Sequence, residues 1–261
     1  MQLQLVRNAT LKLGYAGRII LVDPYLAPRH SLPSFTGKSP NPTAELPITI
    51  EEILAGVDLV IVSHLHTDHF DSVAKERVPK GLPLLCRPGD EETIRRAGFT
   101  DVRPLADEAV WRGIRIVRRE GNHGSGDVLA KMGPVMGFTL EAADEPSVYW
   151  AGDTILYPPV LETIGGFGPD IVITHSCGAL WDSTLIVMDA GQTAATCETV
   201  AEQAVVVATH MEALDHSTVD RAALRSHAEQ RGISSAKLLI PADGETLYFA
   251  PADVGARTVA Q

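Results

Sequence analysis

Residues 57–71 place a dense group of polar side chains directly after a buried strand. Residues 57–63, VDLVIVS, form the short apolar run typical of a strand covered on both faces. The next eight residues, HLHTDHFD, contain three histidines and two aspartates. Because residues i and i+2 of an extended chain project to the same side, His64 and His66 can converge on one ion, whereas a helix would separate them. The segment therefore predicts a metal site at the end of a strand.

A second ion is expected beside the first. The chain turns at Thr67, so Asp68 and His69 stand where a following helix begins and can face another ion. Neutral imidazole and carboxylate groups are ligands that zinc, manganese and iron accept. The alternative is a solvent-exposed turn rich in polar residues, which three histidines within six positions disfavour. One segment cannot complete two coordination shells, so further ligands are predicted elsewhere.

Three later polar residues have the same position relative to an apolar strand. Asp153 follows SVYWAG, His175 follows DIVIT and His210 follows AVVVAT. Side chains at the strand ends of one sheet edge can meet in space despite a long separation in sequence. His123 differs, because it lies in the glycine-rich loop EGNHGSGD, which permits unusual backbone angles and close approach to a ligand.

The rest of the chain alternates strands and helices. Strands are predicted at residues 3–6, 11–15, 18–23, 57–63, 82–86, 114–120, 135–142, 147–152, 170–175, 204–210, 236–241 and 245–250. Helices are predicted at residues 48–56, 71–78, 89–98, 159–166, 191–203 and 217–232. This order predicts an α/β fold in which two packed sheets carry helices outside, a four-layer αββα sandwich. Without a linker-like change in composition, residues 1–261 are expected to form one domain.

A long proline-rich connection occupies residues 24–47. Loops of this length within a compact domain are usually functional or disordered. This loop contains side chains that could contact a ligand, namely Tyr25, Arg29, His30 and Phe35. We expect it to form a lid or a pocket wall.

The charge balance excludes some partners. The chain has 22 Lys and Arg residues against 33 Asp and Glu residues, a formal net charge of -11, and no run of basic residues. This disfavours nucleic acid and anionic membranes as partners. The N-terminus lacks a secretory signal and no segment is long and apolar enough to span a bilayer, so we expect a cytoplasmic protein. Cys86, Cys177 and Cys197 are expected to be buried free thiols.

These motifs together resemble the metallo-β-lactamase fold superfamily of metal-dependent hydrolases. SHLHTDHFD resembles the signature motif, and the histidine of GNHG, the aspartate of AGDT and a late strand-end histidine follow in the same order over nearly the whole chain. LVDPYL, MGPVMGF and THMEALDHST further resemble the branch that includes L-ascorbate-6-phosphate lactonase.

The resemblance implies two bound divalent metal ions, with zinc favoured and manganese or iron as alternatives. By position it implies these ligands: His64, His66 and His123 for one ion, Asp68, His69 and His210 for the other, and Asp153 between the two. His175 is expected to contact the site without ligating. His216, just before a helix, is expected to be a supporting or structural residue.

Other polar residues are expected to support the ligands. Ligating imidazoles normally donate their second N–H to a carboxylate or a carbonyl. Asp23 is the first candidate for this role, with turn formation before Pro24 as its alternative. Asp189 is the second candidate, with helix N-capping as the favoured alternative, and Asp71 is expected to be an N-cap.

The implied chemistry is hydrolysis of a small-molecule ester, lactone or phosphodiester. Two adjacent divalent ions can share a water molecule, lower its pKa and direct it at an electrophile. Asp68 and Asp153 are predicted to orient this nucleophile. Two alternatives remain open, a mononuclear iron dioxygenase of the same fold and a metal-binding scaffold without catalysis. The sequence also leaves open whether the chain forms a homo-oligomer.

Overall fold

Two seven-stranded sheets form the body of the protein. The computed structural model describes residues 1–250. The strands of the first sheet, in spatial order, are β16 (Thr246–Tyr248), β1 (Gln2–Arg7), β2 (Thr10–Tyr15), β3 (Arg18–Val22), β4 (Leu59–Val62), β5 (Leu84–Cys86) and β6 (Val102–Pro104). Those of the second are β15 (Leu238–Leu239), β14 (Val205–Thr209), β11 (Ile171–His175), β10 (Val148–Gly152), β9 (Val135–Glu141), β8 (Ile114–Gly121) and β7 (Glu108–Trp111).

Both sheets have the same pattern of strand directions. From β16 to β3 the pairings are antiparallel, and from β3 to β6 they are parallel. Likewise, β7 to β10 pair antiparallel, and β10, β11, β14 and β15 pair parallel. The parallel strands β4 and β11 are buried along their whole length, which explains their continuous apolar runs.

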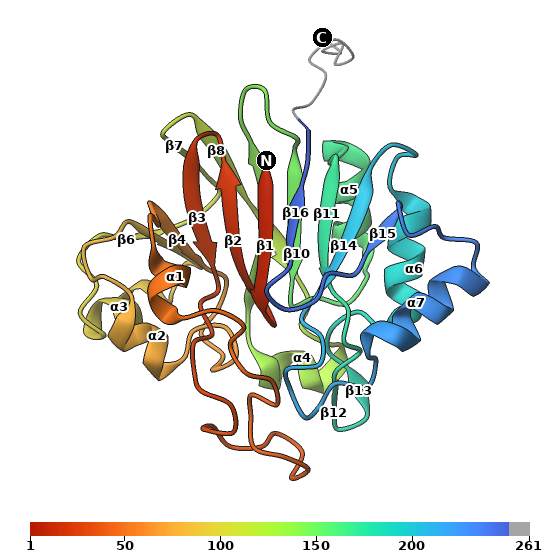
Figure 1. Cartoon of the computed structure of the whole chain (residues 1–261), viewed down its shortest axis with the longest axis horizontal. Coiled ribbons are helices and arrows are strands. Elements are labelled where there is room, and N and C mark those ends of the chain that lie inside the picture. Colours follow the sequence, from red (N-terminus) through yellow and green to blue (C-terminus); the bar gives the residue numbers. More distant parts are fainter. Residues whose placement is uncertain (251–261) are drawn as a thin grey trace.

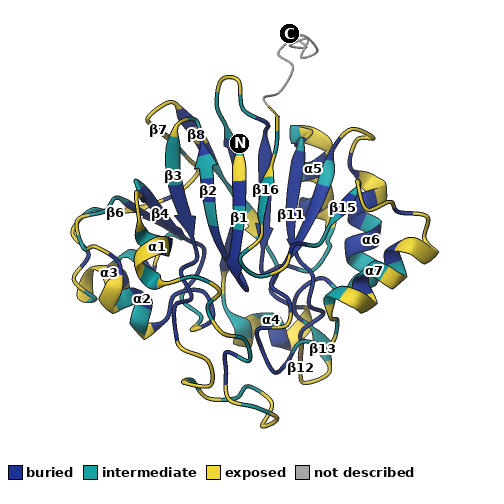
Figure 2. Cartoon of the chain, viewed as in Figure 1, coloured by how far each residue is buried: buried dark blue, intermediate teal, exposed yellow. Residues whose placement is uncertain are grey.

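Helices cover the outer faces of both sheets. α1 (Ile50–Leu54), α2 (Ser72–Arg77) and α3 (Glu91–Arg96) lie on the first sheet, and α5 (Pro158–Phe167), α6 (Ala190–Thr199) and α7 (Arg221–Gln230) lie on the second (Figure 1). The inner faces of the sheets share one apolar core that includes Leu13, Phe138 and Trp150. Separate apolar clusters lie beneath the two groups of helices, whose outer faces are exposed (Figure 2). The predicted four-layer αββα sandwich is confirmed.

Every predicted helix and strand has a counterpart within the described residues, with different ends. The helix predicted at 217–232 begins only at Arg221, because the Asp220 side chain accepts a hydrogen bond from the Ala223 backbone and caps it. Five short elements were not predicted: β6, β7, α4 (Gly126–Met132) and the hairpin of β12 (Leu180–Trp181) and β13 (Thr184–Leu185). The four strands have only two to four residues, too few for a clear hydrophobic period, and α4 buries a single residue, Val128, so it has no apolar stripe.

The loop of residues 24–47 lies at one end of the sandwich, together with α4 and the β12–β13 hairpin (Figure 1). The ends of strands β4, β10, β11 and β14 open toward the same end, so the polar residues that follow these strands gather there. Within residues 1–250, none of the helices has the length and apolar character required to cross a bilayer.

Candidate metal centre

The predicted ligands come from both sheets and meet between them. His64 follows β4, and Asp68 and His69 lie in the turn before α2. Asp153 directly follows β10 and His210 directly follows β14. His123 lies between β8 and α4, in the predicted loop. The structure therefore brings together residues that are up to 146 positions apart, with His64 and His210 at the extremes.

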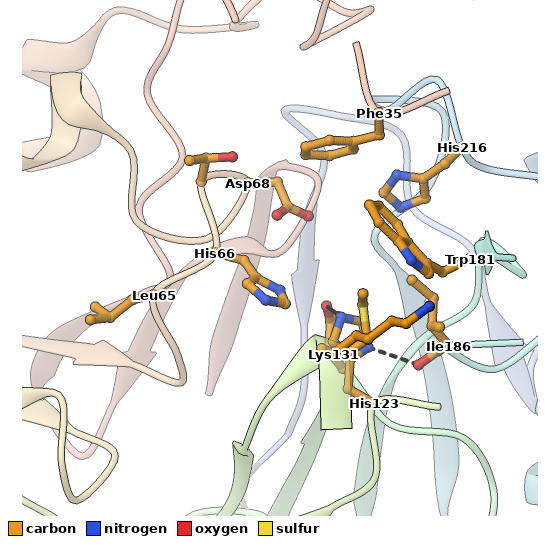
Figure 3. Close-up of a pocket in the computed structure, with 12 residues that line it drawn as sticks. Phe35, Leu65, His66, Asp68, His123, Lys131, Trp181, Ile186 and His216 are labelled. Carbon is orange, nitrogen blue, oxygen red and sulfur yellow. Dashed lines mark hydrogen bonds and ion pairs between the residues drawn. The ribbon is translucent and has the colours of Figure 1, made fainter. Parts of the chain in front are cut away.

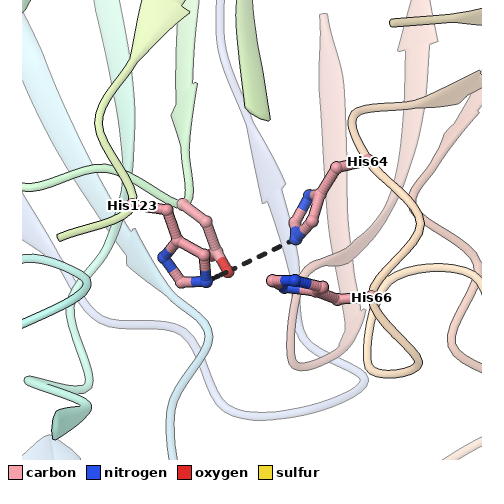
Figure 4. A group of neighbouring side chains, drawn as sticks. His64, His66 and His123 are labelled. Atoms are coloured by element: carbon pink, nitrogen blue, oxygen red, sulfur yellow. Dashed lines mark ion pairs between the residues drawn. The ribbon is translucent and has the colours of Figure 1, made fainter. Parts of the chain in front are cut away.

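The first group of side chains is the one predicted for the first ion. His64, His66, His123 and Asp153 each offer one ligand atom, and these atoms all lie within 4.8 Å of one another. Oδ2 of Asp153 lies 3.3 Å from Nε2 of His123 and 3.8 Å from Nε2 of His64. The three imidazoles converge on a common space (Figure 4).

The second group differs in part from the prediction. It consists of His69, Asp153, His175 and His210, with ligand atoms again within 4.8 Å of one another. Nε2 of His69 and Nε2 of His210 are only 3.3 Å apart. Asp68, predicted as a ligand here, lies outside this set, but its Oδ2 is 3.2 Å from Nε2 of His210. Asp153 belongs to both groups, which is the position expected of a residue that bridges two ions.

Hydrogen bonds on the outer side of four histidines direct their inner nitrogens toward the cluster. Nδ1 of His123 donates to the carbonyl of Ile186 at 2.9 Å, so its other nitrogen, Nε2, is the one that faces Asp153 and can ligate. Nδ1 of His69 lies 2.7 Å from Asp23 Oδ2. The equivalent partners are Ser63 Oγ at 2.9 Å for His64 and Cys177 Sγ at 3.5 Å for His210.

Asp23, Asp189 and Asp71, the other aspartates considered in the sequence analysis, have distinct places. The buried Asp23 carboxylate contacts His69 and accepts hydrogen bonds from the backbone and hydroxyl of Ser63, so it supports the cluster as expected. Asp189 caps α6 by accepting a hydrogen bond from the Gln192 backbone, which confirms the helix-cap alternative. Asp71 caps α2 as predicted.

The aspartates and histidines of the cluster shift one another's pKa values in a way that favours a positive charge near the carboxylates. Burial alone would raise the pKa of Asp153, but the imidazoles of His69, His210 and His123 hold that pKa well below its usual value. Burial would lower the pKa of His69, yet the carboxylates of Asp153, Asp68 and Asp23 raise it to about 10. A buried set of carboxylates that draws positive charge in this way suits a bound cation.

Two buried nitrogens provide an independent test of whether metal ions fit. Nε2 of His64 and Nε2 of His175 are both buried, and neither has a hydrogen-bond partner among the described residues. Burial lowers the pKa of His64 well below its ordinary value and that of His175 to about 3, so both rings are neutral. A buried imidazole nitrogen without a partner is costly unless it ligates. The cluster therefore fits divalent metal ions.

Backbone conformation is constrained at the ligands themselves. His210 has a φ of 62°, a left-handed conformation that is uncommon outside glycine, and its backbone N–H donates to the carbonyl of Asn8 at 2.9 Å. Gly152, before Asp153, has a φ of 70°, and a Cβ atom there would lie 2.4 Å from the Trp150 ring. Only glycine allows β10 to turn Asp153 into the cluster.

A cavity of about 390 Å³ opens onto the candidate metal centre. Figure 3 shows its walls, with His66 and Asp68 facing Phe35, His216 and Trp181 across the space. The floor is formed by His66, Asp68, His123 and Asp153, and the walls are formed by Phe35, Leu65, Thr67, Lys131, Met132, Trp181, Ile186 and His216. The walls are thus largely apolar.

The loop of residues 24–47 contributes to this cavity through Phe35, so it forms a pocket wall as one of its two predicted roles requires. Tyr25, Arg29 and His30 do not line the cavity. Tyr25 is instead buried beneath the guanidinium of Arg7, 4.8 Å from its ring centre.

Sequence reasoning missed Trp181, Met132 and Lys131. The available signal was the tryptophan in the short segment CGALWDST, Trp181, which remains 37% exposed in the structure.

Two histidines differ in their distance from the cluster. His175 was predicted to contact the site without ligating. In the structure it lies closer to the other ligand candidates than that prediction requires, as a member of the second group. His216 belongs to neither group and lies in the cavity wall with its ring centre 4.9 Å from that of Phe35. Cys86, Cys177 and Cys197 are free and buried as predicted.

Comparison with protein families shows which superfamily the chain belongs to. The model described as the β-lactamase superfamily domain matches residues 18–211 of the chain. The chain belongs to this superfamily. Its metallo-β-lactamase fold is confirmed by solved structures that superimpose over almost the whole chain.

Three similar proteins match almost the whole chain. UPF0173 protein YddR of Bacillus subtilis (strain 168) is 34% identical over 256 residues, which cover 95% of this chain and 100% of YddR. An isothiocyanate hydrolase from Delia radicum gut bacteria is 37% identical, with a TM-score of 0.91, over 96% of this chain and 100% of that one. A protein described as a possible metal-dependent hydrolase from Veillonella parvula DSM 2008 is 33% identical, with a TM-score of 0.90, over 95% and 98%.

The protein is therefore one of the metal-dependent hydrolases of this superfamily. The narrower resemblance to the L-ascorbate-6-phosphate lactonase branch stays a prediction, as does the cytoplasmic location.

Proposed function

We propose that this hydrolase acts on small molecules that carry both a neutral electrophilic carbon and an apolar group. Isothiocyanates are the first candidates, followed by esters and lactones with an apolar substituent. The observation that carries the proposal is the position of the cavity: its floor is the candidate metal centre, and its walls include Phe35, Met132 and Trp181. An apolar group gains affinity when such walls remove it from water.

The similar isothiocyanate hydrolase supports the choice of electrophile, because the chains are 37% identical and superimpose over nearly their full lengths. Addition of water to the central carbon of R–N=C=S gives a thiocarbamate, which breaks down to an amine and carbonyl sulfide. Water is therefore the only co-reactant required.

Phosphodiesters fit this cavity less well. Lys131 is the cationic side chain among the wall residues, and its ammonium group lies 2.8 Å from the Asp182 carboxylate. Apart from the metal ions, the cavity lining therefore offers a phosphodiester no unpaired cationic side chain, and the apolar side chains of the walls give its charged oxygens no hydrogen-bond donors.

The roles of individual residues follow from their places. Two divalent ions, with zinc favoured, would be held by the two groups of histidines that share Asp153. When bound, such ions supply Lewis-acid polarisation of the substrate and a lower pKa for water. Asp68 lines the cavity, and although burial would raise its pKa, His69 and His210 hold that pKa well below its usual value. The ionised Asp68 carboxylate can accept a hydrogen bond from the attacking water and so orient it.

A substrate panel tests the proposal. Purified protein with measured zinc content is given phenylethyl isothiocyanate, phenyl acetate, dihydrocoumarin and bis(p-nitrophenyl) phosphate at equal concentrations. We expect hydrolysis to be fastest with the isothiocyanate, measurable with the aryl ester and the lactone, and slowest with the phosphodiester. His66→Ala serves as the inactive control.

Several outcomes would contradict the proposal. Fastest turnover of the phosphodiester would show that the apolar walls do not select the substrate. One iron per chain with oxygen-dependent activity would identify a dioxygenase instead. Full metal content without turnover of any member of the panel would favour the scaffold alternative.

A further inference from the structure

The Asp215 carboxylate binds the tip of the loop that forms the cavity wall. Its oxygens accept hydrogen bonds from the backbone N–H groups of Phe35 at 3.0 Å and Thr36 at 3.1 Å. They also accept from the Thr36 hydroxyl at 2.7 Å, the Asn41 amide at 3.0 Å and the Ser34 hydroxyl. Five donors from four residues thus converge on one side chain that is 8% exposed.

The same segment places a second residue in the cavity. His216 follows Asp215 directly, and its ring centre lies 4.9 Å from that of Phe35 at an interplanar angle of 33°. Both rings line the cavity (Figure 3). Asp215 therefore connects the two residues of this wall: it accepts a hydrogen bond from the Phe35 backbone and directly precedes His216 in the chain.

The two ends of the loop are held by a different side chain. The fully buried guanidinium of Arg7 donates to the carbonyls of Tyr25 at 2.9 Å, Ala27 at 2.8 Å and Ala44 at 3.0 Å. A change at Asp215 would therefore release the tip of the loop while its base stays attached to the first sheet.

We infer that Asp215 is a positioning residue that fixes Phe35 against His216 and thereby sets the preference of the pocket for an apolar group. The selectivity part of this inference rests on the proposed function, because Phe35 selects a substrate only if the apolar part of that substrate enters the cavity. The positioning part rests on the contacts of Asp215 alone. Asp215 lies outside both ligand groups, so its effect on selectivity is separable from metal binding.

A pair of probes isolates the contribution of the wall. Propionate and 3-phenylpropionate share a carboxylate that can reach the metal centre and differ by one phenyl group. Calorimetric titration of zinc-loaded protein gives the ratio of their dissociation constants. We expect wild type to bind 3-phenylpropionate about tenfold more tightly than propionate, as burial of an aromatic ring implies.

Three variants test the role of Asp215. Asp215→Asn replaces one accepting oxygen by an amide donor that faces other donors. The preference for 3-phenylpropionate over propionate, measured as the ratio of their dissociation constants, should therefore fall at least threefold. Propionate affinity and zinc content should stay within twofold of wild type. Phe35→Ala should reduce the ratio to the same extent. Asp220→Asn, the same change at a helix cap that does not contact the loop, should leave the ratio unchanged. An unchanged ratio in Asp215→Asn would overturn the inference.

Trypsin cleavage separates this inference from the proposed function. Arg29 and Lys38 lie in exposed parts of the loop. Cleavage at these sites should be at least tenfold faster in Asp215→Asn than in wild type or Asp220→Asn. If wild type does not prefer the phenyl probe, the apolar substrate proposal fails, and equal cleavage rates would then overturn the positioning role as well. If Asp215→Asn does not fold, the double variant Ser34→Ala, Thr36→Val removes the hydroxyl donors from the loop and is measured in the same way.

Discussion

Nδ1 of His175 lies 2.5 Å from Oδ1 of Asp153, so the histidine that ends β11 is in direct contact with the carboxylate shared by both ligand groups. Its other nitrogen is buried and has no hydrogen-bond partner within residues 1–250. This relationship makes His175 a stronger ligand candidate than its position in the sequence suggested.

His175→Ala is expected to lower the metal content of the purified protein by about one ion per chain, because the second group would lose one of its four ligand atoms. Elemental analysis after dialysis measures this. His216→Ala, which changes a pocket histidine outside both groups, should retain the wild-type content. Equal metal content in His175→Ala and wild type would limit His175 to hydrogen bonding with Asp153.

Asp153→Ala is expected to lose both ions and all turnover, since Asp153 is the member common to the two groups. His66→Ala should lose turnover and at least the ion of the first group. Metal analysis and the substrate panel provide the measurements. Full activity in either variant would refute the ligand assignment.

Asp23→Ala should weaken metal binding by about 10- to 100-fold, because Asp23 orients His69 through a 2.7 Å contact. Asp189→Ala is the matched control, since it removes a helix cap and should cost about 1 kcal/mol of stability without altering metal affinity. Competition with a chelator of known affinity gives the dissociation constants. Similar affinities for the two variants would show that Asp23 acts only as a turn former.

The sequence predicted the site better than it predicted the pocket. His64, His66, His123 and Asp153 were identified because a metal centre requires particular side chains at strand ends and in a glycine-rich loop, and these local signals do not depend on the rest of the chain. Asp215 could not be identified in this way, because its role depends on a contact with Phe35 across 180 residues of sequence.

The membership of the second group was also beyond local reasoning. Whether His175 or Asp68 completes it depends on how far each strand end projects into the space between the two sheets. That distance is set by the packing of side chains such as Trp150, whose ring lies 5.0 Å from that of His175.

Gly152→Ala should destabilise the fold by about 2–4 kcal/mol, because the new methyl group would lie 2.4 Å from the Trp150 ring on a backbone with a φ of 70°. Gly165→Ala is the control. Its Cβ would meet no atom within 4 Å, and alanine in the interior of α5 should add about 0.5–1 kcal/mol of stability. Urea unfolding of the metal-free variants gives both values, and equal stabilities would contradict the constraint at residue 152.

The contribution of Asp215 to stability should depend on pH in a defined direction. Burial would raise the pKa of this carboxyl, but the hydrogen bonds from Ser34, Thr36 and Phe35 lower it far below its usual value. The contribution is therefore complete above the pKa of an unfolded aspartate, about 3.9, and is lost as the pH falls through the lower folded value. The difference in unfolding free energy between wild type and Asp215→Asn, about 2–3 kcal/mol, should stay constant from pH 7 to pH 5 and shrink below about pH 4. A difference that already shrinks at pH 6 would contradict this.

Phe35, Met132 and Trp181 each belong to a segment that carries none of the ligand candidates: the loop of residues 24–47, α4 and β12. Relatives of this protein could therefore acquire new substrates by exchanging these three segments while the reaction centre is inherited intact. The same separation offers a route to engineering. Grafting other loops at these three positions would change the shape of the pocket and leave the residues of the candidate metal centre unchanged.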